Sequence, residues 1–262
     1  MQGDTVKKTF IVAFCLCLFC SVLVSGSAIL LREKQAENKK LDIKKNLLIA
    51  SGLIDNSTVT KSEVEQKFKQ VKTLVVDLKT SEVLTDVKAD SIDMRKNAKD
   101  PSKNIVLSSE NDLAKISTIS QLSKIYLIKN NQNEVEKIVL PVHGKGLWST
   151  LYGFLALDRD KKTIKGLGFY EHAETPGLGG EVDNPKWKKG WVNKIGYDSN
   201  GEPQIKIVKG SVDPKAKGSE KMIDGLSGAT ITANGVQALV NFWLGSQGYG
   251  NIIKNLNVEG AI

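Results

Sequence analysis

Cysteine is nearly absent from this chain of 262 residues. Cys15, Cys17 and Cys20 all lie in one apolar run near the amino terminus, and no cysteine follows them. A disulfide framework or a thiolate metal site needs cysteines within the folded domain. The sequence therefore excludes both after Cys20, and we interpret the three thiols as small apolar side chains that face lipid or packed neighbours.

Arginine is scarce as well. Only Arg32, Arg95 and Arg159 occur, although the formal net charge is +8. Arginine supplies most bidentate contacts to phosphate and guanine, so its scarcity argues against nucleic-acid binding. The positive charge is still compatible with anionic lipid or with an anionic cofactor.

Histidine is limited to His143 and His172, and neither has a cysteine close to it in the sequence. This is a weak basis for a metal site, and we expect none. The chain also lacks a Gly-x-Ser-x-Gly sequence, the turn that exposes the nucleophilic serine of α/β-hydrolases. We therefore expect no hydrolytic residues.

One long apolar run, "FIVAFCLCLFCSVLVSGSAILL", covers residues 10–31 without a charge. At about 1.5 Å per residue, a helix of this length crosses a hydrocarbon core of ~30 Å. A cleaved signal peptide is the alternative, with Lys7 and Lys8 before the run and "SGSA" as the cleavage site. The run resumes as "AILL", which favours a retained anchor. Basic residues flank both ends, so the positive-inside rule gives no orientation.

Residues 1–31 are thus predicted to be an amino-terminal segment with a transmembrane helix, and residues 32–60 a charged helical stem or linker. The remainder, residues 61–262, mixes strand and helix patterns without regular βαβ alternation. The clearest hairpin has two apolar strands around "DRDKK", and the clearest helix is "TANGVQALVNFWLGSQG" with Thr232 as its N-cap. We predict an α+β fold, a mainly antiparallel sheet with packed helices, preceded by one transmembrane helix.

Two glycine-bearing loops stand out in the predicted domain. The stretch "ETPGLGG", residues 174–180, follows a strand, and its glycines permit a flat ligand to approach the backbone. An ordinary turn before a helix near Gly180 explains it equally well. Trp148, in "GKGLWSTLYG", has the right side chain to stack on a ring, although an aromatic residue in a strand more often belongs to the core.

The second loop is "DGLSGATIT", residues 224–232, just before the predicted helix. Its small residues let a ligand approach, and a helix start offers unpaired N–H groups that suit phosphate. Its hydroxyl groups are donors and also potential attachment points. No lysine closes the loop as in a nucleotide-binding P-loop. From the residues alone, a simple capping turn is the more economical interpretation.

The sequence "DGLSGAT" nevertheless resembles the flavinylation motif of proteins that carry FMN in phosphoester linkage to a threonine. The "ETPGLGG" loop and the single amino-terminal span resemble those of one such family, the C subunits of the sodium-translocating NADH:quinone reductase. This resemblance covers essentially the whole chain. The G subunit of the ion-translocating ferredoxin:NAD reductase complex shares the FMN domain but is usually shorter, and the insert at residues 30–130 favours the C subunits.

The resemblance implies an FMN-binding core at about residues 139–248, with FMN attached to Thr230 by a separate flavin transferase. It implies that the Glu174–Gly180 loop lies against the isoalloxazine ring, with Leu178 as an apolar contact. It assigns Thr232 to capping. The other cofactor-binding residues it implies are Asp224, Ser227, Gly228, Ala229, Thr175, Gly177 and Gly179, and Trp148 and Lys145 are weaker candidate contacts.

The implied function is electron relay in a sodium-transporting NADH:ubiquinone reductase, without catalytic residues of its own. Electrons would come from an iron–sulfur-bearing subunit pair and pass to a second FMN subunit. The protein would be a single-pass protein of the inner (cytoplasmic) membrane, with its large domain on the periplasmic side. A membrane-anchored non-redox ligand-binding domain and an assembly factor are the rival interpretations of the same glycine loops. The polar region at residues 85–130 has no function that the sequence supports.

Overall fold

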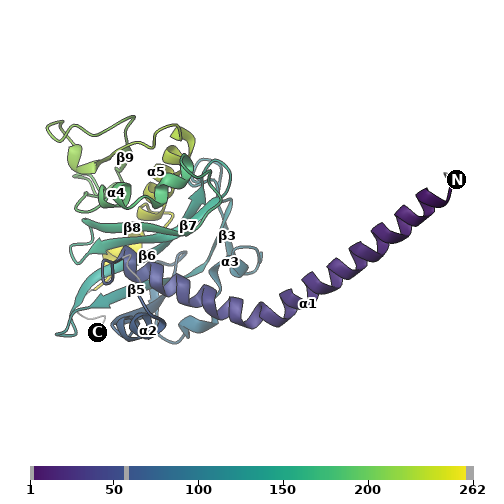
Figure 1. The fold of residues 1–262 in the computed structure, drawn as a ribbon. Helices are drawn as coiled ribbons and strands as arrows, with labels where there is room; N and C mark the ends of the chain where they lie inside the picture. Colours follow the sequence, from purple (N-terminus) through teal and green to yellow (C-terminus); the bar gives the residue numbers. More distant parts are fainter. Residues whose placement is uncertain (1–2, 56–58, 258–262) are drawn as a thin grey trace. The chain divides into compact units, whose positions relative to one another are not determined.

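The structure is a computed structural model that describes residues 3–55 and 59–257 (Figure 1). The chain divides into two compact units, Met1–Ile43 and Lys44–Ile262. Helix α1, Gly3–Ala50, makes up the first unit and continues into the second. Its apolar part has a mean hydropathy of 2.4 and is long and apolar enough to cross a membrane, which is the expected transmembrane helix.

The second unit is built on an antiparallel sheet of six strands in the order β2-β1-β5-β6-β7-β8. Its strands are β1 (Val71–Asp77), β2 (Glu82–Leu84), β5 (Leu122–Lys129), β6 (Val135–Lys145), β7 (Thr150–Asp158) and β8 (Ile164–Glu171). Two small pairs accompany it: β3 (Asn104–Val106) with β4 (Thr118–Ser120), and β9 (Lys206–Ile207) with β10 (Met222–Ile223). The predicted α+β class with a mainly antiparallel sheet is confirmed.

Helical segments connect and cover the strands of the second unit. The α-helices after α1 are α2 (Lys61–Phe68), α3 (Met94–Asn97), α4 (Pro185–Lys189), α5 (Thr230–Leu244) and α6 (Gly250–Asn255). The short 3-10 helices are η1 (Ala89–Ser91), η2 (Gly179–Asp183) and η3 (Ser219–Lys221). Thr60 caps α2 in a capping box with Glu63.

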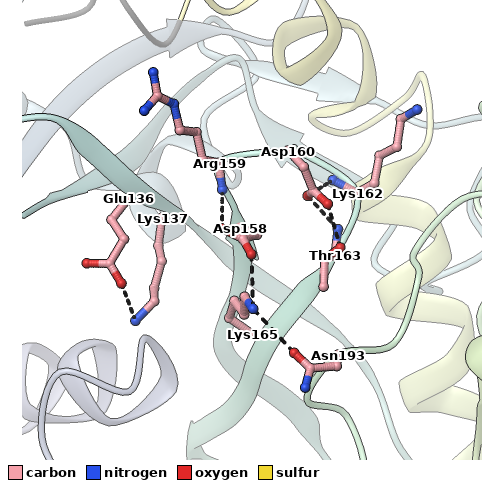
Figure 2. Close-up of polar contacts among 9 residues, drawn as sticks. All are labelled: Glu136, Lys137, Asp158, Arg159, Asp160, Lys162, Thr163, Lys165 and Asn193. Atoms are coloured by element: carbon pink, nitrogen blue, oxygen red, sulfur yellow. Dashed lines mark hydrogen bonds and ion pairs between the residues drawn. The ribbon is translucent and has the colours of Figure 1, made fainter.

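The predicted hairpin around "DRDKK" is formed by β7 and β8 (Figure 2). The Asp160 carboxylate accepts hydrogen bonds from the backbone N–H of Lys162 at 2.8 Å and of Thr163 at 2.8 Å. Across the base of the turn, Lys165 Nζ lies 3.0 Å from Asp158 Oδ2. A carboxylate that accepts backbone N–H groups fixes a tight turn, and so the two strands keep their register.

Helix α5 packs against β6, and this packing brings the predicted acceptor loop, residues 224–229, to the end of that strand. Val236, Leu239 and Val240 are fully buried in the core. A Cβ placed on Gly144 of β6 would lie 2.5 Å from Leu239 Cβ, and one on Gly235 would collide with the Lys145 carbonyl oxygen. Glycine at both positions is therefore what lets the first half of α5 cross the end of β6 closely.

The end of α1 belongs to the second unit rather than to a separate stem. Leu47, Leu48 and Ala50 are buried, and a Cβ on Gly168 of β8 would lie 3.6 Å from Ala50 Cβ. The second unit accordingly begins at Lys44, inside the range 32–60 that the sequence suggests as a stem. In the sequence, the adjacent Leu47 and Leu48 after a charged stretch are the local sign of this packing.

Replacing Leu48 by alanine tests this packing. We expect Leu48→Ala to lower the free energy of unfolding of the second unit by about 2–5 kcal/mol, because it leaves a cavity in a filled core. Chemical denaturation of the detergent-solubilised chain, followed by circular dichroism, measures the change. Leu30→Ala, an equal truncation at a side chain that is 82% exposed, is the matched control and should not shift the transition. Equal stability of the two variants would contradict this packing.

Candidate functional site

A buried carboxylate, Glu174, ties three segments together at the end of β8. Its side chain is only 4% exposed. Oε1 accepts hydrogen bonds from the N–H groups of Trp148 and Ser149, each at 3.0 Å, and from Ser149 Oγ at 3.1 Å. Oε2 accepts from the N–H of Leu147 at 3.2 Å and from Thr232 Oγ1 at 2.6 Å. The "ETPGLGG" loop, the 146–149 loop and the first turn of α5 therefore meet at one side chain.

These donors keep Glu174 charged. Burial alone raises the pKa of a carboxyl group, because the charged form loses its water. Here the hydrogen bond from Thr232 and those from the backbone N–H groups of residues 147–149 outweigh burial and hold the pKa of Glu174 below its ordinary value. A buried charge with this many donors is a fixed structural anchor.

Two glycines allow the backbone to approach this carboxylate. A Cβ on Gly146 would lie 2.6 Å from Glu174 Oε1, and one on Gly179 would lie 2.6 Å from Thr232 Oγ1. Both distances are too short for a carbon atom, so any larger residue would open the cluster. Part of the glycine pattern of the "ETPGLGG" loop thus serves packing around Glu174. Gly177 has a φ of +76° with open space beside it, and shapes the turn itself.

Thr232 does not cap α5, and that prediction is wrong. The helix begins at Thr230, its N-cap position is Ala229, and Ala229 makes no side-chain cap. Thr232 lies inside the first turn, is 1% exposed and donates to Glu174. A hydroxyl in the first turn of a helix can form a hydrogen bond with the backbone at the helix start or with a side chain from another segment. At Thr232 the tertiary fold brings the Glu174 carboxylate within reach.

The acceptor loop presents Thr230 at the surface. Ser227 and Gly228 form the turn, Gly228 has a φ of +68°, and Thr230 is exposed as the first residue of α5. Asp224 fixes the start of the loop. Its carboxylate accepts from the N–H of Val212 at 2.8 Å, and its carbonyl oxygen accepts from Trp187 Nε1 at 2.8 Å.

Thr230 opens onto a cavity of about 780 Å³, a volume typical of ligand sites. Ser227, Gly228 and Asp224 also line it. Two basic residues on its wall, Lys186 of α4 and Lys209, were not predicted as site residues. They are distant from the acceptor loop in sequence, and nothing distinguishes them from the other scattered lysines of the chain.

Exposed apolar side chains lie on the 146–149 loop, on the 174–180 loop and in the first turn of α5. The exposed fraction is 70% for Trp148, 44% for Leu178 and 59% for Ile231. Leu178 lies over Gly228, because a Cβ on that glycine would be 2.9 Å from Leu178 Cδ2. Trp148 is therefore a surface side chain, which excludes the core interpretation, and its stacking on a ring stays a prediction.

The remaining candidates support the loops or lie elsewhere. The carbonyl oxygen of Thr175 accepts from the N–H of Leu178 at 3.1 Å and of Gly180 at 2.9 Å, which closes the glycine turn. His172, which the sequence did not connect with this loop, accepts at Nδ1 from the N–H of Glu174 at 3.2 Å and contacts Asp183 through Nε2 at 2.7 Å. Lys145 lines a different cavity.

Comparison with known proteins identifies similar chains over the full length. An FMN-binding domain model matches residues 146–245. The C subunit of the Na(+)-translocating NADH-quinone reductase of Yersinia pestis is 41% identical, and the match covers 100% of this chain and 96% of that protein. The C subunit of Pseudomonas aeruginosa is 42% identical, and the match covers 97% of each chain. The crystal structure of Shewanella oneidensis NqrC matches with a TM-score of 0.75 at 32% identity, covering 84% of this chain and 97% of that chain.

Replacing Glu174 by glutamine tests its role as the anchor of the site. We expect Glu174→Gln to lower the free energy of unfolding by about 2–4 kcal/mol at neutral pH, because charge-assisted hydrogen bonds to buried donors are lost. Chemical denaturation measures the change. The exposed Glu202→Gln removes the same charge and is the matched control, with no change expected.

The pH dependence of that difference follows from the lowered pKa of Glu174. The charged carboxylate contributes its full stability above the ordinary glutamate pKa of 4.5, and the contribution is lost as the pH falls from there through the lower pKa of the folded state. The difference in the free energy of unfolding between wild type and Glu174→Gln should therefore become smaller on acidification. A gap that stays constant from neutral pH to pH 3 would show that the charge of Glu174 plays no part.

Proposed function

This chain belongs to the family of C subunits of the Na(+)-translocating NADH-quinone reductase, and from that premise we propose that it carries FMN joined through its phosphate to Thr230. It is a membrane-anchored FMN-binding electron-transfer subunit of that oxidoreductase complex, whose other subunits are its partners. FMN supplies the reversible uptake and release of electrons, and the chain holds it in place.

The observation that carries the proposal is the position of Thr230. Its side chain is exposed at the first position of α5 and opens onto the cavity that Lys186 and Lys209 also line. A phosphodiester on this hydroxyl keeps one negative charge. The unpaired N–H groups at the start of a helix and nearby ammonium groups both stabilise such a charge.

Attachment requires a hydroxyl that an enzyme can reach. We assign the reaction to a flavin transferase that uses FAD: Thr230 Oγ attacks the FMN phosphorus, the bond from that phosphorus to AMP breaks, AMP leaves and the hydroxyl proton passes to a base. Exposed Ser227 and Gly228 leave Thr230 Oγ open to such an enzyme. Thr232 is 1% exposed, so it is a poor competitor for the flavin. Asp224, whose two oxygens fix the start of the loop, keeps the acceptor turn in shape.

The isoalloxazine ring is placed by the exposed apolar side chains. Leu178, Trp148 and Ile231 present apolar surface around the acceptor turn, and flat rings bind to such surfaces by stacking and dispersion. Glu174 acts through the backbone: its hydrogen bonds hold the loops that carry these side chains. The chain thus fixes the flavin at two points, its phosphate and its ring.

Within the complex, we assign the FMN of this subunit a place between an iron–sulfur-bearing subunit pair and a second FMN subunit. We place the second unit on the periplasmic side, where a covalent tether prevents the loss of a cofactor that is scarce outside the cytoplasm. Relatives that match over 96–97% of their own length favour the C subunits over the shorter G subunit of a ferredoxin:NAD reductase complex.

Covalent attachment is tested on a denaturing gel under ultraviolet light. The chain co-expressed with its flavin transferase should give a fluorescent band that Thr230→Ala abolishes. Ser227→Ala and Thr232→Val are the matched controls and should keep the band, since valine has the shape of threonine without its hydroxyl. A wild-type chain without a band would exclude covalent FMN. Loss of the band only in one of the controls would move the acceptor to that residue.

The periplasmic position is tested by protease access. In spheroplasts, trypsin should digest the second unit, whose lysines are mostly exposed, while in inside-out vesicles the unit should be protected. An antibody to a tag fused after Ile262 reports the cleavage. The reverse pattern would place the second unit in the cytoplasm.

A further inference from the structure

A second cavity, of about 360 Å³, lies in the second unit apart from Thr230. One wall comes from α3 and from the 115–118 loop, within the polar region for which the sequence suggested no function. The other walls come from the end of β6, from β7 and from β8. The FMN-binding domain model begins only at residue 146, so α3 and the 115–118 loop lie outside it.

The lining of this cavity is strongly basic. Arg95, Lys99, Lys115 and Lys145 line it, and within the part of the chain that the structure describes no aspartate or glutamate does. Arg95 is partly neutralised by an ion pair with Glu171, at 2.7 Å. Among the described residues, the three lysines take part in no ion pair or side-chain hydrogen bond. Unpaired cations around a concave surface attract anions and bind them more tightly than an open surface does.

His143 lies among these cations without a charge of its own. Burial and the nearby Arg95 lower the pKa of His143 to about 4, so the ring is neutral at physiological pH. Its ring stacks on Tyr152 with the centroids 5.3 Å apart, and the Arg95 guanidinium lies 3.5 Å above the same tyrosine ring. In residues 3–55 and 59–257, neither ring nitrogen of His143 has a hydrogen-bond partner. The imidazole can therefore offer one donor and one acceptor to a ligand.

The loop over the cavity is held in an unusual backbone conformation. Lys115 and Ser117 have φ values of +54° and +62°, which residues other than glycine rarely adopt. The Asp112 carboxylate holds the loop by accepting from the N–H groups of Ile116 at 2.8 Å and of Ser117 at 2.7 Å. Strain kept in place by dedicated hydrogen bonds is typical of binding sites, and here it keeps Lys115 at the cavity.

We propose that this cavity binds a small organic dianion, a phosphate ester or a dicarboxylate, at a site separate from the flavin. Three unpaired lysines leave a positive excess that one negative charge would not balance. The volume exceeds that of a bare inorganic ion and lies within the range of small-molecule sites. Tyr152 and His143 also line the cavity, and the neutral imidazole offers a directional hydrogen bond to the ligand.

The test uses the full chain in detergent, with inorganic phosphate and succinate as separate probes. Because the chain has two histidines, nuclear magnetic resonance of labelled imidazoles locates the binding. We expect a saturable shift of the His143 signals with at least one probe, and no shift of His172. The probe that binds more tightly shows whether the site prefers a phosphate-like or a carboxylate-like anion. Absence of a saturable His143 shift with both, or equal shifts of the two histidines, would overturn the proposal.

Variants separate this cavity from the overall charge. The double variant Lys99→Glu, Lys115→Glu should weaken binding at least about tenfold by calorimetry. Lys215→Glu with Lys217→Glu makes the same charge change at exposed positions outside the cavity and should leave the affinity within about twofold. Equally weakened anion binding in the two double variants would contradict a defined site at this cavity. The first variant should keep the fluorescent flavin band, so failure here leaves the Thr230 proposal untouched.

Discussion

The buried carboxylate of Glu174 is the constraint on which the site depends. It accepts from three consecutive backbone N–H groups and from the buried hydroxyl of Thr232, so the 174–180 loop, the 146–149 loop and the start of α5 cannot move independently. Gly146 and Gly179 leave room for this carboxylate, and a side chain at either would push the segments apart. The position of Thr230, two residues before Thr232, is therefore set by a residue far away in the sequence.

The site separates two kinds of hydroxyl that look alike in the sequence. Thr230 and Thr232 are both threonines in the first turn of α5, yet one is exposed and the other is 1% exposed. Burial and the hydrogen bond to Glu174 give Thr232 a structural role, whereas Thr230 is exposed and opens onto a cavity, which is consistent with the attachment proposed for it. The phosphoester proposed for Thr230 would need no dedicated P-loop lysine, which fits a loop with glycines and hydroxyls but no closing cation.

Most of the region at residues 85–130 lies outside the main sheet and instead forms part of the wall of a cavity. Through α3 and the 115–118 loop it covers a basic cavity, and it does so with residues that show no strong hydrophobic period. A segment of this kind is shaped by side-chain to backbone hydrogen bonds, such as those of Asp112, which leave little trace in the sequence. The sequence pattern of this region therefore does not indicate its role.

The sequence by itself determined the apolar span, the α+β class, the β7–β8 hairpin and the acceptor helix, because each follows from local periodicity and turn residues. It also identified the two loops, through their resemblance to a family. Only the tertiary structure decided that Thr232 bonds Glu174 instead of capping, that Trp148 is exposed, and that Lys186 and Lys209 share a cavity with Thr230. These are contacts between residues distant in the chain, and local preference carries no information about which distant partner a side chain will meet.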